Sequence, residues 1–306
     1  YLKTNTMKKL LLVLLIIPIV SYGQLEIKNW PPKIKSDQIY TYKQIDGIDL
    51  NLWVFNPPDH SLSSPKPGIV FFFGGGFRNG TPEQFVKHCE YLSARGMVSI
   101  VADYRVSSRH KVNPTHCLRD AKSAIKWVRK NSKKLGINPN KIVSSGGSAG
   151  GFLAAATGTI SNFEEKNESI EISSKPNLMI LFNPGLISAS TKNYKISDAK
   201  EKRMKLLKVD SKKFSPFHQI SKQTPATLIF HGDADKTVNP QVVELFNSKM
   251  KDYGNSCRLY LYEGEEHAFF NYNKNMNGAF TDTVNKMDKF LVEMGYLSAP
   301  PKSILK

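Results

Sequence analysis

A pentapeptide near the middle of the chain, Gly146–Gly150, has the pattern G-x-S-x-G. Apolar Ile142 and Val143 precede it and the helix-like stretch Phe152–Thr157 follows it, so the sequence predicts a strand, a tight turn and a helix in succession. Glycines on both sides of Ser148 suit such a turn, because they let the strand and the helix approach closely around a strained residue. We therefore predict that Ser148 is a nucleophile held at the end of a buried strand.

An acidic loop and a histidine loop each follow a short apolar strand downstream of Ser148. Asp235 lies in the loop after Leu228–Phe230, and His267 lies in the loop after Leu259–Tyr262. In a Ser…Asp…His triad the histidine takes the serine proton and the carboxylate orients the histidine, and the chain order here is the one this chemistry prefers. The predicted catalytic residues are Ser148, Asp235 and His267.

Other residues compete for two of these roles. Asp233 is an alternative to Asp235, and His231 and His218 are alternatives to His267. Small residues beside His267 suit a mobile catalytic loop, whereas His231 at a strand end is expected to be buried in a supporting role.

Three glycines, Gly74–Gly76, directly follow the apolar strand Ile69–Phe73. Backbone N–H groups bared by such a loop can stabilise a tetrahedral oxyanion, together with the N–H of the residue after the nucleophile. We predict an oxyanion hole at Gly75, Gly76 and Ala149. An ordinary flexible turn is the alternative interpretation.

These motifs together resemble the hormone-sensitive-lipase-like branch of the α/β-hydrolases, and within it the secreted bacterial esterases that remove acetyl or feruloyl groups from polysaccharides. The resemblance is carried by the glycine loop, Asp103–Arg105, the elbow, the HGDADKTV segment from His231 and the terminal histidine loop. It runs from about Tyr40 to about Val292. It implies a carboxylic ester hydrolase that works through an acyl-enzyme and needs no cofactor.

The resemblance also bears on single residues. The family spacing H-G-x-x-D-x-x-V assigns the triad acid to Asp235 rather than Asp233. The histidine that usually precedes the three glycines, and helps to hold their loop, is Phe73 here. Asp103 and Arg105 are expected to form a structural ion pair near the site.

The substrate is less constrained than the chemistry. Phe77 and Phe269 are tentative pocket residues, although aromatic side chains are more often plain core. We expect an acylated carbohydrate or a small ester as substrate. A lipid or short-chain carboxylesterase and a prolyl-oligopeptidase-type peptidase are alternatives within the enzymes, and a non-catalytic binding protein of the same fold is the alternative from another class.

The rest of the chain alternates between predicted strands and helices. A hairpin of Ile39–Ile45 and Ile48–Phe55 turns at Asp46-Gly47, a favoured two-residue turn. The remaining predicted strands are Ile69–Phe73, Met97–Ala102, Ile142–Ser145, Leu178–Phe182, Thr227–Phe230 and Arg258–Tyr262. The predicted helices are Pro82–Arg95, Pro114–Leu135, Gln241–Tyr253 and Thr281–Met294. This order predicts an α/β-hydrolase fold with a mostly parallel, eight-stranded sheet and helices on both faces.

Pro184–Phe214 interrupts the alternation, and within it only Asp198–Lys208 has a helical pattern. We interpret residues 184–214 as a short cap over the site, with a disordered surface loop as the alternative. The whole of residues 24–306 is interpreted as one catalytic domain.

The N-terminal segment has the features of a secretory signal. Met7 and two lysines precede the apolar run Leu10–Val20, and Ser21–Gly23 has the small-x-small pattern of a cleavage site. The run is too short for a comfortable membrane span. We expect translation to start at Met7, cleavage near Gly23 and a secreted or periplasmic protein.

Charge and cysteine content exclude several other classes. The net charge of +17 is spread along the chain without a basic cluster interleaved with aromatic residues, which disfavours nucleic-acid binding. Cys89, Cys117 and Cys257 can form at most one disulfide, and Cys89 and Cys117 are the pair nearest in sequence. Their spacing matches no zinc pattern, so we predict no metal site.

Overall fold

The computed structural model describes residues 30–299, and from Pro32 onward these form one compact unit. The secretory signal predicted over residues 7–23 lies outside the described residues. None of the described helices is long and apolar enough to span a membrane.

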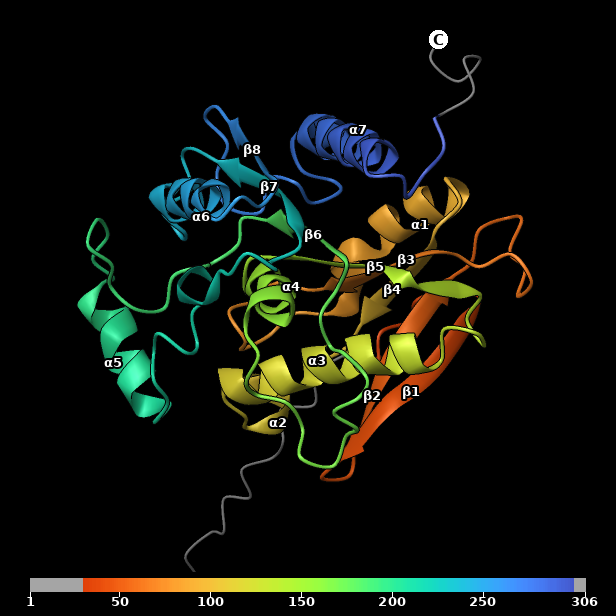
Figure 1. Ribbon diagram of the computed structural model, residues 1–306, viewed down its shortest axis with the longest axis horizontal. Helices are drawn as coiled ribbons and strands as arrows, with labels where there is room; N and C mark the ends of the chain where they lie inside the picture. The colour runs from red at the N-terminus through yellow and green to blue at the C-terminus, as the bar shows by residue number, and fades with distance from the viewer. Residues whose placement is uncertain (1–29, 300–306) are drawn as a thin grey trace, which may run out of the picture. The chain divides into compact units, whose positions relative to one another are not determined.

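Eight strands form one sheet in the order β1-β2-β4-β3-β5-β6-β7-β8 (Figure 1). The β1–β2 and β2–β4 pairs are antiparallel, whereas all pairs from β4 to β8 are parallel. This sheet confirms the predicted α/β-hydrolase fold class. The strands are β1 Gln38–Ile45, β2 Ile48–Phe55, β3 Lys66–Phe72, β4 Val98–Ala102, β5 Ile137–Gly147, β6 Leu178–Phe182, β7 Ala226–Gly232 and β8 Cys257–Tyr262.

The first hairpin turns where the sequence predicts. Asp46 and Gly47 both have positive φ, 52° and 73°, as a two-residue turn that follows the twist of its strands requires. Ile45 and Ile48 are directly paired across it. The chain then leaves this edge of the sheet and continues as parallel strands.

Alternate residues of the central strands enter two separate cores. Val70 and Phe72 of β3 belong to one core, and Ile69 and Phe71 belong to the other, because successive side chains of a strand point to opposite faces. Helices α3 Pro114–Lys130, α4 Ala149–Thr159 and α6 Gln241–Asp252 cover the first face. Helices α1 Val86–Ala94 and α7 Gly278–Glu293 cover the second (Figure 1).

Several boundaries differ from the prediction. Helix α7 begins at Gly278, three residues before the predicted Thr281, and β5 begins at Ile137, five residues before the predicted Ile142. The predicted helix Pro114–Leu135 ends at Lys130, with Asn131 as its C-cap, and the next five residues form turns that lead into β5. The predicted helix Pro82–Arg95 begins with a 3₁₀ turn, Pro82–Phe85, before α1. The sequence analysis also missed the single-turn helix α2, Ser107–His110.

The segment predicted as a cap contains one helix, α5 Asp198–Leu206, whose N-cap Ser197 accepts a hydrogen bond from the Lys200 N–H. Most of this helix is exposed, but the segment around it is anchored in the first core by the buried side chains of Leu186, Ile187, Ile196, Met204 and Phe214. Because those apolar side chains are removed from water, the segment is packed against the rest of the domain. Its interpretation as a cap over the site stays a prediction.

The cysteine pairing considered from the sequence does not form. Cys89, Cys117 and Cys257 are all free and buried. Cys89 on α1 packs in the second core and Cys117 on α3 packs in the first, so the sheet separates them. Nearness in sequence was misleading because α1 and α3 cover opposite faces of the sheet.

The ion pair expected between Asp103 and Arg105 is also wrong. Arg105 binds the buried carboxylate of Asp120 through two hydrogen bonds of 2.8 Å. Asp103 instead accepts a 2.8 Å hydrogen bond from Arg109 on α2. Each residue therefore finds its partner on a helix that follows β4, and these pairs hold α2 and α3 against the end of that strand.

Candidate active site

The turn between β5 and α4 holds Ser148 in a strained conformation. Its φ is 53° and its ψ is −114°, which is rare for a residue with a side chain. Close contacts explain the surrounding glycines: a Cβ on Gly146 would lie 2.6 Å from the Phe72 carbonyl oxygen, and one on Gly147 would lie 2.5 Å from the Phe270 ring. The end of β3 can lie this close to Gly146, and the Phe270 ring this close to Gly147, only because neither position has a side chain.

Gly150 is the tightest of these positions, and its substitution tests the packing of the turn. A Cβ there would lie 2.0 Å from the Phe72 carbonyl oxygen and 2.4 Å from that of Phe73. We expect Gly150→Ala to lower the free energy of unfolding by about 3 kcal/mol or to prevent folding, because backbone atoms would have to move. Chemical denaturation measures the change.

The matched control is Gly278→Ala at the start of α7. A Cβ at Gly278 would meet nothing within 4 Å, and its φ of −58° is helical. The free energy of unfolding of this variant should differ from that of the unsubstituted protein by about 1 kcal/mol or less. Equal losses in the two variants would show that crowding at the turn is not what requires Gly150.

The structure brings the three predicted catalytic side chains into one hydrogen-bonded chain. His267 Nε2 lies 2.9 Å from Ser148 Oγ, and His267 Nδ1 lies 2.7 Å from Asp235 Oδ2. Asp235 is buried, whereas the His267 side chain keeps 22% of its exposure. With its proton on Nδ1, the imidazole can accept the serine proton at Nε2.

Four donors hold the Asp235 carboxylate. The backbone N–H groups of Thr237 and Val238 donate to Oδ1, while His267 and the amide of buried Asn183 donate to Oδ2. Burial by itself would raise the pKa of this carboxyl, but these hydrogen bonds and the nearby imidazole outweigh it and lower the pKa below its ordinary value. Asp235 is therefore an anion at neutral pH.

Asn183 is a site residue that the sequence analysis missed. It lies at the end of β6 with a φ of 43°, and its amide Nδ2 is 2.9 Å from Asp235 Oδ2. The sequence offers one indication of its role, which is its position directly after the predicted apolar strand Leu178–Phe182. Because the carboxyl ends of parallel strands meet at one edge of the sheet, this position places a residue near the site, but it does so for any polar residue that follows such a strand.

The competing residues lie elsewhere in the site or outside it. Asp233 Oδ1 accepts a hydrogen bond from the Gly264 N–H and does not face His267. His231 is buried, and its Nε2 donates to the Val238 carbonyl oxygen at 2.9 Å. Burial lowers its pKa, so it is neutral beside Asp235. His218 hydrogen-bonds Ser215 in a separate 3₁₀ turn.

The glycine loop after β3 presents two N–H groups without acceptors in the described part of the chain, those of Gly75 and Gly76. The Gly75 carbonyl accepts from the N–H groups of Arg78 and Asn79, and the Gly74 carbonyl packs against Gly80. In a trans peptide the N–H points opposite to the carbonyl, so these contacts turn both N–H groups away from the Arg78–Gly80 turn.

A third N–H group comes from the helix that follows the serine. Ala149 is the first residue of α4, and the first hydrogen bond back along this helix runs from Phe152 to the Ser148 carbonyl. The Ala149 N–H is therefore one of the groups that a helix N-terminus leaves unpaired. Gly75, Gly76 and Ala149 thus retain the donors that the sequence analysis assigned to an oxyanion.

The two tentative pocket residues have different environments. Phe77 is half-buried beside the glycine loop and packs edge-on against Phe152. Phe269 is fully buried in the second core, where it packs against Tyr262 and Phe270. The assignment of Phe269 to a substrate pocket is therefore wrong, because a ring enclosed by core side chains cannot contact a ligand.

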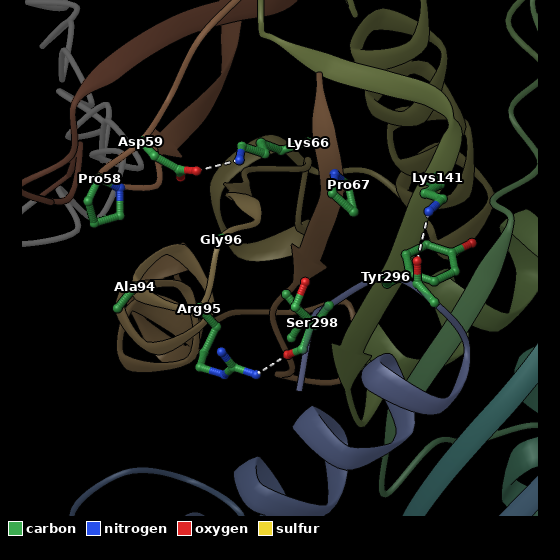
Figure 2. Close-up of a pocket in the computed structure, with 12 residues that line it drawn as sticks. Pro58, Asp59, Lys66, Pro67, Ala94, Arg95, Gly96, Lys141, Tyr296 and Ser298 are labelled. Carbon is green, nitrogen blue, oxygen red and sulfur yellow. Dashed lines mark hydrogen bonds and ion pairs between the residues drawn. The ribbon is translucent and has the colours of Figure 1, made fainter. Parts of the chain in front are cut away.

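A separate cavity of about 560 Å³ lies at the opposite ends of the parallel strands (Figure 2). Each of its three basic side chains has a partner: Lys66–Asp59, Arg95–Ser298 and Lys141–Gly295. The seven residues of β3 put about 20 Å between this cavity and the glycine loop. It is therefore not part of the site around Ser148. Residues 30–299 contain no group of three or more His, Cys, Asp or Glu placed to hold a metal ion.

Comparison with known proteins agrees with this geometry. The BD-FAE family model matches residues 54–250, and that of the dienelactone hydrolase family matches residues 212–295. Two solved structures of a thermophilic esterase of Thermogutta terrifontis, one with propionate and one with butyrate bound, align to this chain with 44% and 43% sequence identity. Its propionate complex has a TM-score of 0.85, over 89% of this chain and 99% of that one.

Two curated relatives are esterases as well. Esterase LipC of Mycobacterium tuberculosis is 26% identical over 68% of this chain, and an acetylxylan esterase of Xylanibacter ruminicola is 27% identical over 66%. The matches span 54% of the first protein and 40% of the second, so this chain corresponds to only part of each. The described domain is that of a serine ester hydrolase.

Proposed function

Because this chain belongs to the BD-FAE family, we propose that the protein hydrolyses carboxylic esters through an acyl-enzyme on Ser148. The observation that carries the proposal is the continuous path of hydrogen bonds from Ser148 Oγ through His267 to Asp235. The unpaired N–H groups beside it add the second requirement of acyl transfer, which is stabilisation of an oxyanion.

The reaction proceeds in two halves at these residues. Ser148 Oγ attacks the ester carbonyl while His267 Nε2 takes its proton, and the oxyanion is bound by the N–H groups of Gly75, Gly76 and Ala149. His267 then protonates the leaving alcohol, which leaves the acyl group on Ser148. Water deprotonated by His267 attacks this acyl-enzyme and releases the acid, while the Asp235 anion stabilises each imidazolium.

The proposed substrates are short acyl esters, in particular acetyl groups on a polysaccharide. Three things support this choice: the propionate and butyrate in the Thermogutta esterase, the acetylxylan esterase among the curated relatives, and the secretory pattern of residues 7–23. The secretory pattern supports the further proposal that the reaction takes place outside the cytoplasm. Fold similarity alone is a poor guide to substrate, so the acyl length needs a direct test.

A chain-length series tests the acyl preference. We expect kcat/KM for the nitrophenyl acetate to exceed that for the octanoate by about tenfold or more, because a site shaped for short acyl groups has no room for the additional methylenes. Acetate should also be released from acetylated xylan. Ester hydrolysis is followed by nitrophenol absorbance and acetate by an enzymatic assay, with Ser148→Ala protein as the background control.

Other outcomes favour other functions. Activity rising from acetyl to octanoyl, with no acetate released from the polysaccharide, would replace the carbohydrate proposal with a lipid esterase. Cleavage of a prolyl peptide substrate faster than of any ester would indicate the peptidase. Tight binding of the polysaccharide without hydrolysis of any ester would indicate a non-catalytic binding protein.

A further inference from the structure

One side chain connects the glycine loop to the histidine loop, and the sequence analysis did not single it out. Gln84 lies in the 3₁₀ turn before α1 and is half-buried. Its Oε1 accepts a 2.6 Å hydrogen bond from the Gly74 N–H. Its Nε2 donates a 2.9 Å hydrogen bond to Asn271 Oδ1, four residues after His267.

The contact with Gly74 is one of two that hold the first peptide group of the glycine loop, the one between Phe73 and Gly74. The carbonyl of this peptide, on Phe73, accepts a 2.7 Å hydrogen bond from the Tyr104 hydroxyl, and its N–H is the one bound by Gln84. The Phe73 ring also stacks on Tyr104, with ring centroids 4.1 Å apart. The start of the loop is thereby held by the Tyr104 hydroxyl and the Gln84 amide.

The contact with Asn271 reaches the loop that carries the catalytic base. The Asn271 N–H donates to the Ala268 carbonyl at 3.2 Å and closes the turn directly after His267. Ala268 has a φ of 64°, so this turn depends on contacts to hold an uncommon conformation. Gln84 therefore holds the segment that sets the position of the imidazole.

Gln84 and the nucleophile both lie beside Gly74. A Cβ on Gly74 would lie 3.4 Å from Ser148 Cβ and 3.5 Å from Gln84 Oε1. The Gly75 N–H, one residue further, is a proposed oxyanion donor. A shift of the Gly74 peptide would move that donor relative to Ser148.

We propose, on the basis of the ester hydrolase function above, that Gln84 is a positioning residue that holds the oxyanion loop and the His267 loop in register. It does not touch the reacting atoms. Its two hydrogen bonds set the distance between the donors that stabilise the oxyanion and the base that takes the serine proton. Displacements of about 1 Å in such a site can cost about a hundredfold in rate.

The test is Gln84→Met, which keeps the length of the side chain and removes both hydrogen bonds. We expect kcat/KM for nitrophenyl acetate to fall by about a hundredfold, mostly in kcat. Affinity for a trifluoromethyl ketone, which mimics the tetrahedral state, should fall by a similar factor. Gln44→Met is the matched control and should match the unsubstituted enzyme. Gln44 is an exposed glutamine on β1, and among the described residues its side chain hydrogen-bonds only Asp49.

A second substitution, Asn271→Leu, removes the hydrogen bond between Gln84 and the His267 loop but keeps the one between Gln84 and Gly74. It should lower kcat/KM by about tenfold alone and add little to Gln84→Met, because its effect runs through Gln84. If the double variant lost activity by the product of the two single losses, Asn271 would not act through Gln84, and the proposal would be overturned.

Titration of active sites with an organophosphate distinguishes positioning from loss of folded protein. Positioning predicts the full number of reactive serines with a lower rate per site. A reduced number of sites with an unchanged rate per site would overturn the proposal, as would unchanged ketone affinity in Gln84→Met. If the unsubstituted protein hydrolyses no ester, the proposed function fails instead.

Discussion

Ser148→Ala is expected to abolish ester hydrolysis while leaving the fold intact. Removal of the nucleophile of a triad lowers kcat by about a million-fold, because the histidine and carboxylate then have no oxygen to activate. The Cβ of alanine occupies the position of the serine Cβ, and within residues 30–299 the lost hydroxyl hydrogen-bonds only His267. Nitrophenyl acetate hydrolysis measures the activity, and the thermal midpoint measures the fold.

Ser145→Ala is the matched control for this variant. Ser145 lies on β5, three residues before Ser148, and is fully buried, and its Oγ has no hydrogen-bond partner among residues 30–299. Its substitution removes an unsatisfied polar group, so activity and stability should be retained. If the Ser148 variant kept even a tenth of the activity, the nucleophile assignment would be wrong.

Asp235→Asn is expected to lower kcat by about ten-thousand-fold. The present carboxylate accepts from four donors, and its lowered pKa keeps it ionised at neutral pH. An amide has one NH₂ end, which would donate to His267 Nδ1 and leave the imidazole proton on Nε2, where it blocks acceptance from Ser148. Steady-state kinetics with nitrophenyl acetate at neutral pH measure the loss.

Asp233→Asn provides the comparison. Asp233 accepts one hydrogen bond from the Gly264 N–H, which an asparagine oxygen can also accept. Its activity should therefore stay within about threefold of the original, as expected for a substitution outside the reacting groups. A greater loss for Asp233→Asn than for Asp235→Asn would move the triad acid to Asp233.

Local patterns in the sequence were enough to predict the strands and the loops that follow them. Apolar runs such as Leu178–Phe182 coincide with the observed strand, because a strand buried on both faces needs every residue to be apolar. The Asp46-Gly47 turn was predictable for a similar reason, since its backbone conformation restricts the residues that fit. Helix ends were less predictable, as at Lys130, because Leu135 lies seven residues after Val128 and so continues the apolar spacing of the helix into the following turns.

Contacts between distant segments were decided only by the tertiary structure. Asn183 and Asp235 are 52 residues apart, and Gln84 and Asn271 are 187 residues apart. No spacing in the sequence indicates that these amides meet. The error at Phe269 has the same origin, because only the packing of α7 and β8 determines which aromatic residues of the histidine loop are enclosed.

The sequence by itself determined the parallel sheet and the three loops at its carboxyl edge, because burial and turn conformation restrict the residue types allowed at each position. The structure decided how those loops are held to one another: the partners of Asp103 and Arg105, the separation of Cys89 from Cys117, and the bridge through Gln84. Such contacts depend on distances of a few ångströms between segments far apart in the chain. A polar side chain satisfies the same hydrogen-bonding requirement with any partner that the fold places within reach.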